Sequence, residues 1–63
     1  MSAKAKLNSA IQSIDDAERV IKRIRNATDD GDLQYQLRKA MRELDEAKQY
    51  IDRAMREVAS LER

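Results

Sequence analysis

Apolar residues recur every seven positions along both halves of the chain. In a heptad lettered a to g, the a positions are Leu7, Ile14 and Ile21 in the first half and Leu37, Leu44, Ile51 and Val58 in the second. The d positions are Ala3, Ala10, Ala17 and Ile24, then Leu33, Ala40, Ala47, Ala54 and Leu61. This period is typical of α-helices that pack as a coiled coil. It predicts helices at about residues 3–28 and 32–62.

The pattern breaks between Thr28 and Asp32, where the chain carries Asp-Asp-Gly. Gly31 is the only glycine, and we expect it to take the left-handed conformation that often ends a helix. Asp30 or Asp32 is expected to cap the second helix, and Ser2 the first. A turn of about residues 29–31 forces the helices antiparallel. The predicted fold is all-α: one domain, residues 1–63, forming an antiparallel two-helix hairpin of the coiled-coil type.

Folding the chain at this turn places large residues opposite small ones, for example Ile14 opposite Ala47. Such layers interdigitate well. The predicted hairpin core is Leu7, Ala10, Ile14, Ala17, Ile21, Ile24, Leu37, Ala40, Leu44, Ala47, Ile51, Ala54 and Val58.

Layers that are half alanine bury little surface, and a domain of this size usually needs further support. Ile11, Met41 and Met55 fall at e positions, and Val20 and Tyr50 at g positions. These five residues widen the apolar stripe beyond the seam of two helices. We therefore expect them to mediate self-association, with a homodimer forming an antiparallel four-helix bundle.

Charge pairs at the acid-first i,i+4 spacing should stabilise the individual helices. The sequence offers Asp15–Arg19, Glu18–Lys22 and Asp52–Arg56.

Composition excludes several classes of chemistry. Cysteine and histidine are absent, which removes disulfides, the commonest zinc ligands and the usual nucleophile–base pairs. Thirteen basic residues nearly balance twelve acidic ones, so no global charge attracts nucleic acid or membrane. Together with the absence of a long apolar stretch, this predicts a cytoplasmic, non-enzymatic protein with no cofactor, metal, small-molecule ligand or membrane contact.

The densest basic segment lies in the first helix, with Arg19, Lys22, Arg23 and Arg25 as possible nucleic-acid contacts. In length and layout the chain resembles the Rop family of plasmid RNA-binding proteins, which are short helical hairpins that dimerise. That resemblance implies RNA binding by the first helix, although this helix lacks the aromatic residue that the Rop surface uses.

Three hypotheses for function follow. The first is a structural or protein-interaction module that self-associates, with an unidentified protein partner. The second is a Rop-like RNA-binding adaptor. The third is a designed bundle without a biological function, which the regular layers favour.

Overall fold

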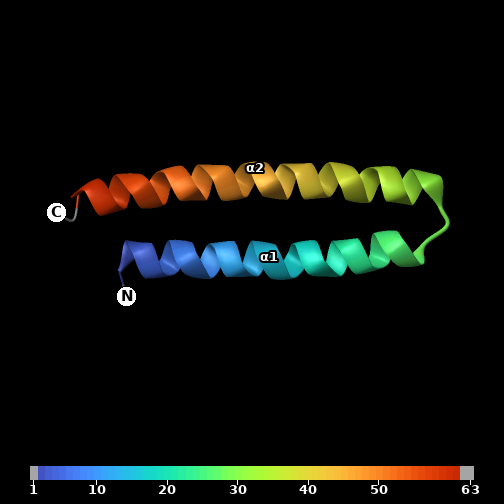
Figure 1. The fold of residues 1–63 in the computed structure, drawn as a ribbon, viewed down its shortest axis with the longest axis horizontal. Helices are drawn as coiled ribbons and strands as arrows, with labels where there is room; N and C mark the ends of the chain where they lie inside the picture. Colours follow the sequence, from blue (N-terminus) through green and yellow to red (C-terminus); the bar gives the residue numbers. More distant parts are fainter. Residues whose placement is uncertain (1, 62–63) are drawn as a thin grey trace.

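The computed structural model describes residues 2–61, which form two antiparallel helices and confirm the predicted hairpin. Helix α1 spans Ala3–Ala27 and helix α2 spans Gly31–Leu61. The molecule is a flat rod with extents of 50 × 17 × 10 Å. The longer α2 projects past the beginning of α1 at the end away from the turn (Figure 1). The predicted residue 62 of the second helix lies outside the described residues.

Side chains adjacent to the helices determine where each helix begins. The Ala5 amide donates to Ser2 Oγ at 3.2 Å, so Ser2 caps α1 as expected. The Asp32 and Leu33 amides donate to Asp30 Oδ1 at 3.0 and 3.2 Å, which makes Asp30 the cap of α2. These bonds satisfy amides that lack a partner within the helix.

Thr28 ends α1 and organises the connection. Its backbone is extended, with φ −102° and ψ 143°, and its amide donates to the Ile24 carbonyl at 3.1 Å. Its hydroxyl accepts a hydrogen bond from the Asp30 amide at 3.2 Å, and its carbonyl accepts one from Gln34 Nε2 at 2.8 Å. The side chain of Thr28 and that of Gln34, in the first turn of α2, thus both hold the connection.

The prediction that Gly31 would be left-handed is wrong. No glycine has a positive φ, and Gly31 is the first residue of α2. The physical reason is the ending of α1 at Ala27, one residue earlier than predicted. The extended Thr28 then turns the chain, so no left-handed residue is needed.

The seam between the helices lies closer to the a and e positions of α1 than the heptad pattern predicts. Ile11 and Arg25, both at e, are half-buried, and Glu18, also at e, is buried. Ala17 and Ile24, both at d and both assigned to the core, are instead exposed. A helix with one neighbour can cover only one stripe, and the attraction between Glu18 and Lys48 favours the a/e stripe. The other members of the predicted core are half-buried.

Among the described residues, no hydrophobic side chain is fully buried. The accessible surface is 5102 Å² for a chain of 7.3 kDa. A compact monomer of that mass would expose about 4,200 Å². The hairpin alone therefore leaves roughly 900 Å² more surface in water than a compact protein would.

Candidate interaction surfaces

The position of the seam gives the hairpin two different faces. On α1 the seam lies at the a and e positions, whereas on α2 it is centred on the a positions, with half-buried d and e positions on either side. In an antiparallel hairpin of this kind the d positions of both helices fall on one side and the b positions on the other. We call the side with the d positions the apolar face and the side with the b positions the charged face.

The apolar face combines small residues with exposed larger ones. Ile24 is 44% exposed and Leu33 is 39% exposed, while Ala17 is exposed between them and the N-terminal end of α1. The alanines at d on α2, which are Ala40, Ala47 and Ala54, are half-buried. Alanine lets another helix approach closely, so this face is flat and can be covered by a second helix pair.

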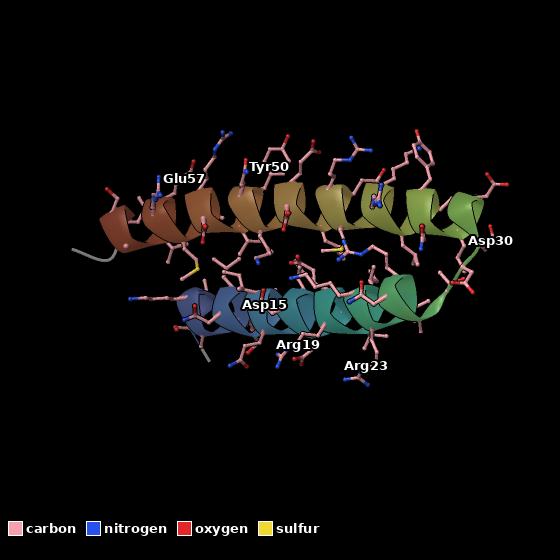
Figure 2. All side chains as sticks on the ribbon, turned by 45° about the vertical axis from the view of Figure 1, so that its right-hand side comes forward. Asp15, Arg19, Arg23, Asp30, Tyr50 and Glu57 are labelled. Atoms are coloured by element: carbon pink, nitrogen blue, oxygen red, sulfur yellow. The ribbon has the colours of Figure 1, made fainter. Side chains whose placement is uncertain are left out.

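The five residues predicted to mediate self-association are divided between the seam and the surface. Ile11, Met41 and Met55 are half-buried along the seam of the hairpin itself. Val20 and Tyr50 are exposed by 51% and 66%, at the outer edges of the apolar face. Figure 2 shows Tyr50 directed away from α1. The surface still available to a partner therefore lies on the side of Val20 and Tyr50.

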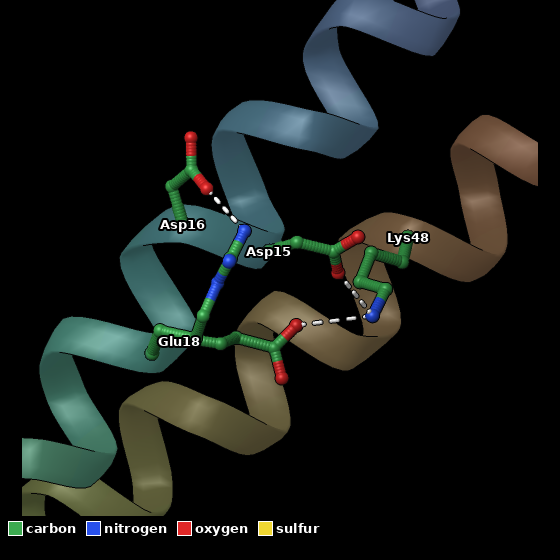
Figure 3. A network of polar contacts seen from close by, with 5 residues as sticks. Asp15, Asp16, Glu18 and Lys48 are labelled. Carbon is green, nitrogen blue, oxygen red and sulfur yellow. Dashed lines mark hydrogen bonds and ion pairs between the residues drawn. The ribbon is translucent and has the colours of Figure 1, made fainter.

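An ion cluster joins the helices on the charged face. The Lys48 ammonium lies 2.8 Å from Asp15 Oδ1 and 3.2 Å from Glu18 Oε1. Figure 3 shows both contacts as dashed lines. Glu18 is 9% exposed and is the only buried side chain among residues 2–61. Burying a carboxylate without a partner costs folding free energy. The ammonium of Lys48 offsets this cost by pairing with Glu18.

The same contacts change the acid–base behaviour of Lys48. Hydrogen bonds to Asp15 and then Glu18 raise the pKa of its ammonium well above the ordinary lysine value of 10.5. Lys48 therefore stays charged throughout the neutral range.

Two of the ion pairs predicted within α1 are replaced by other contacts. Asp15 and Glu18 pair with Lys48 across the seam rather than with the basic residues one turn further along α1. Arg19 pairs instead with Asp16, three residues before it, and both side chains are largely exposed. No ion pair of Asp52 with Arg56 forms among residues 2–61.

Two of the four basic residues proposed as nucleic-acid contacts share one surface. Arg19 and Lys22 both line the hollow that contains the acidic Asp15 and Glu18, and Arg19 is paired with Asp16. Arg23 points away from α2 on the outer side of α1 (Figure 2). Arg25 instead turns toward α2, where its Nη1 donates to Met41 Sδ at 3.7 Å.

A groove near the turn collects residues that the sequence pattern did not single out as a group. It has a volume of about 460 Å³ and combines one arginine of α1 with two of α2. It is lined by Arg25, Tyr35, Arg38, Met41, Arg42 and Asp45. Arg38, Arg42 and Asp45 lie one turn apart along one side of α2, a spacing that could have been found in the sequence. The approach of Arg25 depends on the rotation of α1.

No family model, curated protein or solved structure matches this chain. Within residues 2–61, neither helix has an apolar stretch long enough to cross a lipid bilayer.

Proposed function

We propose that this protein is a non-enzymatic interaction module that pairs with a second copy through its apolar face, giving an antiparallel four-helix bundle. The observation that carries the proposal is the exposed apolar surface around Ile24 and Leu33 on a hairpin without a fully buried hydrophobic residue among those described. A stable interface buries about 800 Å² on each partner. The excess surface of the hairpin is close to that area.

The chemistry of the face favours a second copy as the partner. The d positions of the apolar face are occupied by Ala, Ile and Leu, and the face carries no charge at those positions. The large d residues Ile24 and Leu33 lie at the turn end of this face, and alanines occupy most of its length. A twofold rotation that reverses the hairpin would therefore place the large residues of each copy against alanines of the other. The charged face is less suitable, because Lys48 and Asp15 would lose water on association.

Sedimentation equilibrium over a range of concentrations tests the proposal, with helix content followed by circular dichroism at each concentration. We expect a dimer at micromolar concentration for the unmodified protein. Ala17→Glu places a charge on the apolar face at a position that the hairpin itself leaves exposed, so it should weaken the dimer strongly.

Ala59→Glu is the matched control, because Ala59 is an exposed alanine at a b position of α2. It should leave the dimer intact. A fully helical monomer at micromolar concentration for the unmodified protein would overturn the proposal, as would equal weakening by the two variants.

A further inference from the structure

We propose that the groove near the turn is a binding site for a phosphate monoester, with Arg25, Arg38 and Arg42 as ligands of the phosphoryl oxygens. The first support is that the guanidinium of Arg25 has hydrogen-bond donors without a strong acceptor among the described residues. This residue is half-buried, and the one hydrogen bond that its side chain makes among residues 2–61 goes to the thioether of Met41. Thioether sulfur is a weak acceptor, whereas a guanidinium carries five donors. No carboxylate among residues 2–61 forms an ion pair with Arg25.

The second support is the convergence of like charges. Arg38 and Arg42 stand four residues apart on α2, so they repel one another on adjacent turns. Arg25 adds a third positive charge from α1, and Asp45 supplies the only negative one in the lining. The groove therefore has a net charge of +2.

Geometry and size favour a compact dianion over an extended polyanion. Guanidinium groups bind phosphate oxygens in a bidentate manner, and several can surround one phosphoryl group. A nucleic-acid strand needs a line of cations instead. Continuing along the charged face from the groove, such a strand would meet the acidic Asp15 and Glu18.

The remaining walls indicate what carries the phosphoryl group. Tyr35 and Met41 line the groove beside the arginines and offer an aromatic ring and a polarisable apolar side chain. A volume of about 460 Å³ is sufficient for a small aromatic phosphate. The site is on the charged face, so it stays accessible whether or not the apolar face binds a second copy.

Titration of the isotopically labelled protein with phenyl phosphate, followed by nuclear magnetic resonance of the arginine side chains and backbone amides, tests the site. We expect saturable shifts confined to the turn end of the hairpin, and weaker binding of inorganic phosphate. Arg25→Gln and Arg42→Gln should each weaken binding roughly three- to tenfold, since each removes charge-assisted hydrogen bonds from an open site.

Two further variants sharpen the test. Lys39→Gln removes an equal charge from an exposed position of α2 outside the groove, so binding should be unchanged. Asp45→Asn removes the negative charge of the groove and should tighten binding.

The proposal is overturned if phenyl phosphate causes no saturable shift, or if Lys39→Gln weakens binding as much as Arg42→Gln. The same titration with a short single-stranded RNA tests the alternative ligand. RNA binding that is tighter than phenyl phosphate binding and depends on Arg19 and Lys22 would overturn the site in favour of a nucleic-acid surface on α1.

Discussion

Replacing Gly31 by alanine gives a prediction whose sign depends on the conformation of the turn. Gly31 has no positive φ, and a Cβ built on it meets no atom within 4 Å. Alanine therefore fits the native backbone and restricts the unfolded chain, which stabilises by about 0.4–1 kcal/mol at compatible sites. Because Gly31 is the first residue of α2, we expect about 0.5 kcal/mol, near the lower end. For a domain of this size, the melting temperature should rise by roughly 2–4 °C.

Thermal unfolding followed by far-ultraviolet circular dichroism measures this effect, with all variants at one protein concentration because association also stabilises. Chemical synthesis allows a matched control that carries D-alanine at position 31. D-alanine favours a positive φ, so it should melt below the L-alanine variant. A lower melting temperature for Gly31→Ala than for the unmodified protein would show that Gly31 is left-handed after all and would refute the reasoning.

Three other predictions concern the cap and the ion cluster. Asp30→Ala should lower the free energy of unfolding by about 1 kcal/mol, since it removes both capping bonds of α2. Asp29→Ala should change the melting temperature little, because the Asp29 carboxylate accepts no hydrogen bond among residues 2–61. Lys48→Met should lower the melting temperature by leaving Glu18 unpaired, and adding Glu18→Leu to that variant should restore stability; no recovery in the double variant would contradict this account. Because the folded-state pKa of Lys48 is raised, its contribution to the free energy of unfolding should be constant below pH 10.5 and should decline as the pH rises above that value. Denaturant titrations in alkaline buffers would detect this loss of stability in the unmodified protein, and Lys48→Met should not show it.

The sequence was sufficient to predict the two helices and the Ser2 cap, and to narrow the cap of α2 to Asp30 or Asp32, because those features depend on local spacing. A seven-residue apolar period and a polar interruption need no knowledge of the neighbouring helix. The carboxylate of Asp30 likewise acts on amides two and three residues away. Gly31 was misread because a single glycine after a helix is compatible with either a helix end or a helix beginning.

The rotation of α1 could not be predicted, because the a positions are flanked by two possible partners, d and e. The apolar d positions favoured a seam of a and d residues. The ion pair of Glu18 with Lys48 forms in the observed seam of a and e residues. Glu18 has a basic residue one turn away in its own helix, so the sequence offered a local partner of equal quality. The groove was missed for the same reason, since Arg25 reaches Met41 only after this rotation.

The short connection also has a kinetic consequence. Only three residues separate the helices, so bringing the two helix ends together at Thr28 and Asp30 costs little chain entropy. Contacts can then form in sequence from the turn outward, each closing a loop only slightly longer than the last. Substitutions beside Thr28 should therefore slow folding, while those near Leu7 and Val58 should mainly speed unfolding. The far end of the rod, where α2 extends past α1, is the last part to close and the first to open.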